Sequence, residues 1–196
     1  MVLTLYGGAR SRASMPRWYL EEKGIPYAWV QLDLEAGEHR QPPFTAINPF
    51  AKVPALVDAT LTTTTGEPLR LFESGAILQH LAEHHGREFV GPQGAVRRSL
   101  TCQWLLFANA TLATALFVPA NREREFPRLM ATLDALLAGG PLLEGGWGAA
   151  DCAVQAHLAY LPVFFPQIDL SPYPAVRAVI AAAQASPAYQ RGMGRG

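Results

Sequence analysis

A proline near the start of an apolar, strand-like run at residues 53–57 limits what this chain can fold into. Proline has no N–H to give to a sheet, so Pro54 belongs among the first residues of a strand or at a sheet edge. A cis bond between Val53 and Pro54 would leave the N–H and C=O of Val53 free for an extended ligand, which is the geometry of strand addition. Taken alone, Pro54 is better explained as an ordinary turn residue, because most prolines mark turns.

An acid and a hydroxyl, Glu73 and Ser74, stand where a strand-like segment ends and apolar residues at helical spacing begin. A helix N-terminus presents free N–H groups and a partial positive charge, so it binds carboxylates well. Ser74 can cap the helix or donate to a ligand carboxylate, and Glu73 can accept from an ammonium group. A plain N-cap explains either residue alone. Together with Pro54, they predict one pocket for the backbone and the charged ends of a small peptide.

The order of the predicted elements indicates an α/β half followed by an all-helical half. Elements up to residue 85 run βαβ and then ββα, which is the thioredoxin-like arrangement with a right-handed crossover. Residues 89–94 are typical of a linker. We therefore expect a thioredoxin-like domain at residues 1–85 and an all-helical domain at residues 92–196. The expected strands are 2–6, 27–32, 53–58 and 69–72, and the expected helices are 15–23, 74–85, 96–120, 126–138, 150–163 and 174–185.

The composition favours a soluble protein with a sizeable core and no polyanionic partner. Of 196 residues, 49% are hydrophobic and 16% are charged, and the formal net charge is zero. A neutral chain gives no sign of binding nucleic acid or an anionic membrane surface. We see no apolar run that would cross a bilayer and no signal peptide, so we expect a cytoplasmic protein without membrane contact.

The cysteines and histidines form no metal or redox motif. Cys102 and Cys152 have neither CxxC nor zinc-ligand spacing, and both lie in apolar helical contexts where we expect them to be buried. No metal is therefore expected. Four further histidines likewise show no metal-ligand pattern, namely His80, His84, His85 and His157.

The Val53-Pro54 and Glu73-Ser74 pairs resemble motifs of the cytosolic glutathione S-transferases, and the resemblance covers essentially the whole chain. In that family, a Val-Pro pair with a cis bond and a Glu/Gln-Ser pair lie in the thioredoxin-like domain, and the second pair holds the γ-glutamyl end of glutathione. Asp151 matches an aspartate near the start of the family's central C-terminal helix. The family usually has a Ser or Thr N-cap three residues earlier, where this chain has Gly148.

The resemblance implies that the thiol-activating residue lies in the loop at residues 7–16. A free thiol has a pKa of ~8.5, and a hydrogen-bond donor in a positive environment stabilises the nucleophilic thiolate near neutral pH. The loop has no cysteine, so a glutaredoxin-like mixed-disulfide mechanism lacks its nucleophile. We rank Ser11 first, Arg10 second, and Ser14 and Tyr6 behind them. The structural alternatives are N-capping for the serines and sheet packing for Tyr6, and for Tyr6 the alternative is favoured.

The resemblance also implies how the remaining groups of the substrates are held. His39 and Lys52, with Arg12, are expected at the glycine carboxylate of glutathione, although an exposed loop histidine explains His39 equally well. The electrophile is expected between the two domains, against Trp104 and Phe107. Core packing is the favoured alternative for either aromatic residue taken singly.

The function implied by the resemblance is that of a glutathione S-transferase, in which the glutathione thiolate attacks a small apolar electrophile in detoxification. Glutathione would be a co-substrate, no metal would be needed, and the protein would be a homodimer. The run at residues 10–14 is most similar to the serine-type bacterial branch and to the chi-type enzymes of cyanobacteria. The alternatives are a glutathione-dependent isomerase or peroxidase, and a non-catalytic binding protein of the same fold.

Overall fold

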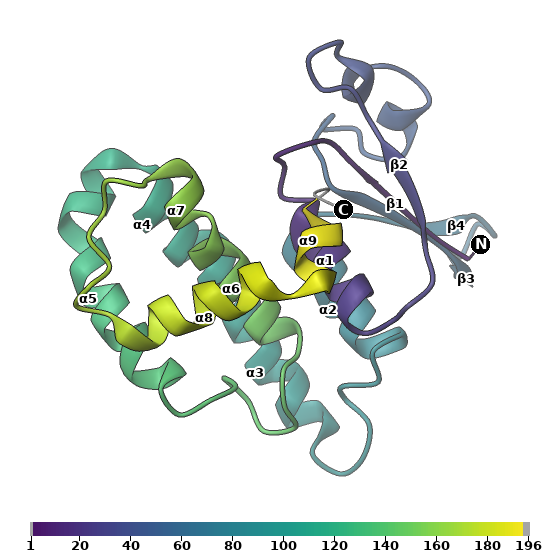
Figure 1. Ribbon diagram of the computed structural model, residues 1–196. Helices are drawn as coiled ribbons and strands as arrows, with labels where there is room; N and C mark the ends of the chain where they lie inside the picture. Colours follow the sequence, from purple (N-terminus) through teal and green to yellow (C-terminus); the bar gives the residue numbers. More distant parts are fainter. Residues whose placement is uncertain (1, 194–196) are drawn as a thin grey trace.

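The first part of the chain folds into a four-stranded mixed sheet. The computed structural model describes residues 2–193, and the strand order is β2-β1-β3-β4 (Figure 1). β1 pairs in parallel with β2, whereas β3 is antiparallel to both β1 and β4. The predicted thioredoxin-like arrangement is therefore confirmed. The strands are β1 (Leu3–Gly7), β2 (Ala28–Gln31), β3 (Ala55–Thr62) and β4 (Pro68–Phe72).

Two helices, α1 (Ser14–Glu22) and α2 (Ser74–His84), lie between the sheet and the helical half of the molecule (Figure 1). Alternate side chains of β1, Leu3 and Leu5, are buried, whereas Tyr6 is only half-buried. The sheet thus presents one apolar face to the helices. The long connection between β2 and β3 is irregular, as expected, and holds two short 3-10 turns, η1 (Glu38–Arg40) and η2 (Phe44–Ala46).

The helical half is built around α6 (Ala149–Ala159), in which every residue except Gln155 is buried. A helix that is apolar nearly all round must be covered on all sides, and α6 contacts α1, α2, α3 and α8. The predicted central helix is confirmed. The other helices are α3 (Gly94–Leu106), the π-helical η3 (Phe107–Leu112), α4 (Ala113–Phe117), α5 (Pro119–Leu137), α7 (Leu161–Phe164), α8 (Pro174–Ala185) and α9 (Pro187–Gly192).

The helical half departs from the prediction at several points. The predicted helix 150–163 is divided into α6 and α7, and the predicted helix 96–120 ends at Phe117 after the π-helical η3. Helix α5 begins at Pro119 rather than near residue 126. Proline ends the preceding helix but also suits the first turn of a new one, where no N–H donor is needed. Helix α9 has no counterpart among the predicted helices. It packs against α1, and a Cβ on Gly192 would lie 2.9 Å from the backbone of Trp18, so the close approach requires glycine there.

The continuous helical segment Gly94–Phe117 is 24 residues long and, by length and composition alone, is apolar enough to cross a membrane. One helix that passes a test of length and composition does not overturn the sequence prediction that no run crosses a bilayer. Core helices of soluble proteins pass the same test. Here the segment packs against α2 and α6, so its apolar side chains help to build the helical half.

Asp151 fixes the start of α6. Its carboxylate accepts hydrogen bonds from the backbone N–H groups of Leu142 (2.9 Å) and Gly148 (3.2 Å), and the side chain is almost fully buried. Asp151→Ala is expected to lower the free energy of unfolding by about 1.5 kcal/mol, because two buried N–H groups lose their acceptor. Urea unfolding measures the change. The matched control is Asp169→Ala, which removes an exposed carboxylate that bonds only Ser171. Equal losses in the two variants would contradict the expectation.

Candidate functional site

Three segments meet at one edge of the sheet. β3 runs antiparallel to β1 and β4. The N-terminal end of β3 therefore lies beside the C-terminal ends of β1 and β4, and this end of the strands is the sheet edge meant here. The loop after β1, the segment before β3 and the β4–α2 junction therefore come together. Three clefts there, which we call the narrow, side and wide clefts, are lined by all of the predicted site residues except Tyr6, Trp104 and Phe107.

The narrow cleft, of about 40 Å³, lies between Arg12, Val53 and the start of α2. The Val53–Pro54 peptide bond is cis, as expected. Within residues 2–193, Val53 lies just outside β3 and makes no backbone hydrogen bond. Its N–H and C=O groups are thus placed to bind an extended peptide by strand addition.

Asn48 holds the segment that carries Val53. The Asn48 side chain is buried, donates from Nδ2 to the carbonyl of Lys52 at 2.7 Å, and accepts at Oδ1 from the N–H of Phe50 at 3.1 Å. These bonds close the turn that precedes Pro54. Sequence reasoning missed Asn48. The signal that could have found it is an asparagine directly before a proline, a pair that favours turns.

Glu73 caps the N-terminus of α2 in a strained backbone conformation, with φ of 68° and ψ of 120°. A residue with a Cβ rarely adopts positive φ, and such strain persists where the surroundings impose it, often at ligand-binding sites. The Glu73 side chain is exposed and lines the narrow cleft. A carboxylate and the free N–H groups of α2 therefore face the same space, which suits a ligand carrying both an ammonium group and a carboxylate.

Ser74 connects this junction to the helical half. Its Oγ donates to Oδ1 of Asn109 at 3.0 Å, and Asn109 Nδ2 donates to the carbonyl of Leu105 at 3.0 Å. Asn109 lies in the π-helical η3, and a Cβ on Gly75 would lie 2.8 Å from its amide nitrogen. Sequence reasoning missed Asn109, since nothing local links it to Ser74.

The side cleft, of about 340 Å³, adjoins the narrow cleft through Lys52 and Val53. It brings His39, on η1, next to Lys52, and Arg40 adds a second positive charge beside that of Lys52. The Nδ1 atom of His39 is buried without a hydrogen-bond partner among the described residues. A buried polar atom without a partner is uncommon. The cleft therefore suits an anionic group.

The loop after β1 orders Ser11 through its own backbone. Ser11 Oγ donates to the carbonyl of Gly8 at 2.7 Å and accepts from the N–H of Ala13 at 3.3 Å. Arg10, which has φ of 54°, is exposed beside it. Ser11 and Arg10 line the wide cleft, whereas Arg12 turns into the narrow cleft. Ser11 thus accepts from a backbone N–H just before α1, as the capping alternative expects in part. Its side chain nevertheless lines the wide cleft.

Ser14 meets a tyrosine from the helical half. The hydroxyls of Ser14 and Tyr160 are 2.7 Å apart, and Ser14 Oγ also donates to the carbonyl of Ser11 at 3.0 Å. Ser14 therefore accepts from Tyr160. Burial raises the pKa of Tyr160 to about 12, so its hydroxyl keeps its proton. Tyr160 was not among the predicted residues, and its only signal is a polar aromatic at the end of a buried helix.

The wide cleft, of about 580 Å³, spans both halves of the molecule. Trp29 forms part of its wall, and the guanidinium of Arg17 lies 4.4 Å from the centre of that ring. Val163 and Phe164, both exposed, face it from α7. The cleft thus combines apolar walls with the hydroxyls of Ser11 and Ser14, which suits an apolar molecule reacting at one polar end.

Trp104, Phe107 and Tyr6 lie elsewhere. Trp104 and Phe107 contact each other edge to face with ring centres 5.5 Å apart and pack against the hydrophobic core. Tyr6 is half-buried and packs near Phe44, with ring centres 5.9 Å apart, in line with its sheet-packing alternative. None of these three residues lines the three clefts.

The two cysteines differ in exposure. Cys152 is buried, as expected, and burial raises the pKa of its thiol well above the usual range. Cys102 is exposed on α3, so the expectation that it is buried was wrong. It lies on the polar side of a helix whose apolar pattern could not fix which face is covered. Neither thiol lines the clefts, so the site has no protein thiol nucleophile.

The chain is similar to known proteins over both halves. The family model described as the glutathione S-transferase N-terminal domain matches residues 1–83. The disulfide-bond oxidoreductase YfcG of Escherichia coli (strain K12) is 34% identical over 176 residues, covering 81% of this chain and 79% of that protein. Glutathione S-transferase F10 of Arabidopsis thaliana is 30% identical over 184 residues, covering 83% of this chain and 79% of that protein.

A solved structure shows the same architecture. A glutathione transferase from Burkholderia graminis, with two glutathione molecules bound per subunit, has a TM-score of 0.78 and 29% sequence identity, covering 97% of this chain and 87% of that chain. The similarity includes both the sheet and the helices that follow it.

Proposed function

The chain belongs to the glutathione S-transferase family, and we propose that it binds glutathione at the three clefts and conjugates its thiolate to small apolar electrophiles. The observation that carries the proposal is the position of Val53. Its unpaired backbone lies between the Glu73–Ser74 junction and the His39–Lys52 cleft. Glutathione is an extended tripeptide with an ammonium and a carboxylate at one end and a second carboxylate at the other, which matches this order of groups.

The two ends of glutathione are assigned by charge. Its γ-glutamyl ammonium pairs with Glu73, and the neighbouring carboxylate accepts from the backbone N–H of Ser74 and the other first N–H groups of α2, while the Ser74 hydroxyl stays on Asn109. Its glycine carboxylate lies in the side cleft, against His39 and Lys52. Arg12 lines the narrow cleft together with Glu73, which supports a contact with the γ-glutamyl carboxylate instead of the glycine end that the sequence suggested.

The thiol of glutathione then reaches the wall formed by Ser11 and Ser14, with Arg10 adding positive charge. The Ser11 hydroxyl turns from the carbonyl of Gly8 to the sulfur and stabilises the thiolate. Ser14 stands one helical turn further on, and its hydroxyl supplies a second hydrogen bond when it turns from the carbonyl of Ser11 to the sulfur, while it still accepts from Tyr160. The thiolate forms a carbon–sulfur bond with the electrophile, either by addition or with loss of a leaving group, so no metal or redox cofactor is required.

The second substrate is placed in the wide cleft. Trp29 and Phe164 line the same cleft as the two serines, so we favour them over Trp104 and Phe107 as electrophile contacts. We therefore assign glutathione binding to residues 1–85 and an electrophile site shared between residues 1–85 and residues 92–196. The specific branch within the family, serine-type or chi-type, rests on the Arg10–Ser14 run alone.

We extend the proposal to a cytoplasmic homodimer with a role in detoxification. Phe50 is 67% exposed and contacts Phe72 edge to face, with ring centres 5.4 Å apart. Leu106 on α3 is also exposed. Exposed apolar side chains of this kind are covered when two copies associate. Sedimentation at micromolar concentration tests the dimer.

Ser11→Ala is expected to lower kcat/KM for conjugation of an aryl halide or an isothiocyanate about tenfold, because the thiolate loses one hydrogen-bond donor. Steady-state kinetics measure the change, and glutathione affinity stays within about threefold of wild type. The matched control is Ser99→Ala, an exposed serine on α3 that bonds only its own helix. An unchanged kcat/KM removes Ser11 from the role and leaves Arg10 and Ser14. A wild-type protein whose melting temperature does not rise with millimolar glutathione contradicts the whole proposal.

A second candidate is reduction of disulfides by glutathione, suggested by the similarity to the oxidoreductase YfcG. The bound thiolate would attack the disulfide, and a second glutathione would release glutathione disulfide from the mixed intermediate, so electrons balance without a protein thiol. The wide cleft has the volume for a second small molecule. A panel of aryl halide, isothiocyanate, peroxide and small disulfide substrates separates this activity from conjugation.

A further inference from the structure

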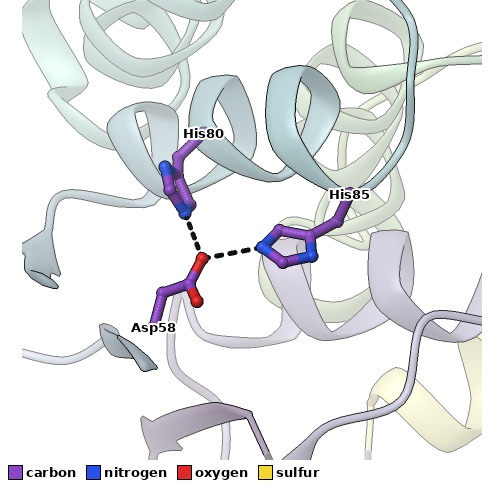
Figure 2. A group of neighbouring side chains, drawn as sticks. All are labelled: Asp58, His80 and His85. Carbon is purple, nitrogen blue, oxygen red and sulfur yellow. Dashed lines mark hydrogen bonds and ion pairs between the residues drawn. The ribbon is translucent and has the colours of Figure 1, made fainter. Parts of the chain in front are cut away.

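Two histidine rings converge on one buried carboxylate at the far end of α2. His80 Nε2 lies 2.8 Å from Oδ2 of Asp58, and His85 Nε2 lies 2.7 Å from the same oxygen (Figure 2). One ligand atom from each residue lies within 4.8 Å of the other two. The three side chains therefore surround a single point with two imidazole nitrogens and a carboxylate oxygen.

The fold creates this cluster from separate elements. Asp58 is on the central strand β3 and is fully buried. His80 is on the inner side of α2, and His85 is the first residue after that helix, which brings its ring back toward the sheet. The second oxygen of Asp58 is occupied separately, because it accepts from the N–H of Thr60 at 2.8 Å and from the Thr60 hydroxyl at 2.6 Å. Oδ2 is thus left to the two histidines.

We propose that Asp58, His80 and His85 form a binding site for a divalent cation of the zinc class. Two imidazoles and one carboxylate are a common donor set for such ions, with a water as the fourth ligand. Thr60 holds the carboxylate in the way that hydrogen-bonding partners orient metal ligands. His85 is 17% exposed at its side chain, which gives the ion and its water a route to solvent.

The geometry needs only a small adjustment to take the ion. Zn²⁺ lies about 2.0–2.2 Å from such donors, so neighbouring ligand atoms in a tetrahedral site are roughly 3.4 Å apart. The two Asp58–histidine distances must therefore widen by about 0.6–0.7 Å, and each imidazole must carry its proton on Nδ1 so that Nε2 can coordinate. Rotation of the two rings supplies this movement without shifting β3.

The site has a structural role, distinct from the clefts. None of the three clefts described within residues 2–193 is lined by Asp58, His80 or His85. Helix α2 has 11 residues and is about 16 Å long, with Glu73 and Ser74 at its start and the histidines at its end. A bound ion ties the end of α2 to the central strand, while the start of the same helix faces the narrow cleft.

Zinc titration of the chelator-treated full chain tests the proposal. Calorimetry is expected to give one Zn²⁺ per chain, and the melting temperature is expected to rise by about 5–10 °C at a free concentration of 100 times the Kd. Co²⁺ provides a second measurement, because four-coordinate Co²⁺ has intense visible absorption bands. The double variant His80→Gln/His85→Gln is expected to lose the bands and the stoichiometric binding.

His84→Gln is the matched control, because His84 is exposed and its ring lies 4.7 Å from that of His80 without facing Asp58. It is expected to bind Zn²⁺ as the wild type does. If the double variant does not fold, His85→Gln, which changes a ring beyond the end of α2, is expected to weaken binding at least tenfold. Wild-type protein that takes up less than one equivalent, or variants that keep the wild-type affinity, would overturn the proposal.

Discussion

Glu73→Ala is expected to weaken glutathione binding by about 100-fold, or roughly 2.7 kcal/mol. The Glu73 carboxylate is the anionic side chain in the narrow cleft, where Arg12 and Lys52 are cationic. Its loss leaves the glutathione ammonium without a counter-charge as the ligand is drawn out of water. Alanine keeps the Cβ, so the unfavourable φ of 68° remains and the variant isolates the carboxylate from the backbone.

Calorimetric titration with glutathione measures the effect. Glu73→Gln is expected to fall between alanine and wild type, since the amide oxygen still accepts a hydrogen bond but carries no charge. Glu123→Ala, which removes an exposed carboxylate on α5, is the matched control and should leave the affinity unchanged. If Glu73→Ala binds glutathione within about threefold of wild type, the γ-glutamyl end does not lie at this junction.

The glutathione half of the site could be predicted because its signals are local. Pro54 and the Glu73–Ser74 pair each mark a change of backbone state, from loop to strand and from strand to helix. The topology then brings both to one sheet edge. Asn109 and Tyr160 could not be found in this way. They reach the site from 35 and 146 positions beyond their partners Ser74 and Ser14, so only the packing of the helical half reveals them.

The aromatic residues of the helical half show a different limit. Trp104 and Phe107 are three positions apart and so lie on one face of an apolar helix. Helical periodicity identifies such a face but does not tell whether it lines a cleft or packs in the core. Val163 and Phe164 lie on the short helix α7, and the predicted helix 150–163 did not show which of its side chains face a cleft. The fold class was predictable because it depends on the order of elements, whereas the electrophile contacts depend on which face of each helix is covered.

The histidine cluster was missed for a related reason. His80 and His85 are five positions apart, which does not match the spacing of one helix face, and His85 lies beyond the end of α2. The one available signal was Asp58. An aspartate inside an apolar strand must find donors or a cation when it is buried, but its partners are 22 and 27 positions away.

His157 is expected to make the protein less stable as the pH falls from 6.5 toward 4. It is fully buried in α6, its Nδ1 lies 2.8 Å from the carbonyl of Ala153, and its Nε2 has no partner among the described residues. The neutral ring therefore donates from Nδ1. Burial, and to a smaller extent the nearby Arg12 guanidinium, lower the pKa of His157 to about 4.

The direction of the effect follows from proton binding. Between pH 6.5 and about 4 the unfolded chain holds a proton on His157 and the folded protein does not, so stability is full above pH 6.5 and is lost as the pH falls. At 1.36 kcal/mol per pKa unit, the loss approaches about 3 kcal/mol at pH 4. Below the folded-state pKa both states hold the proton, so this contribution no longer changes with pH.

Urea unfolding of wild type and His157→Gln at several pH values isolates the contribution, because every other titrating group is common to both proteins. Glutamine can donate to the Ala153 carbonyl and does not titrate, so the difference between the two curves should grow steadily below pH 6.5. His84→Gln, at an exposed position, should run parallel to wild type. If the stability of His157→Gln changes with pH in parallel with that of wild type, the ring takes up its proton in the folded protein over the same pH range as in the unfolded chain, and the expectation is contradicted.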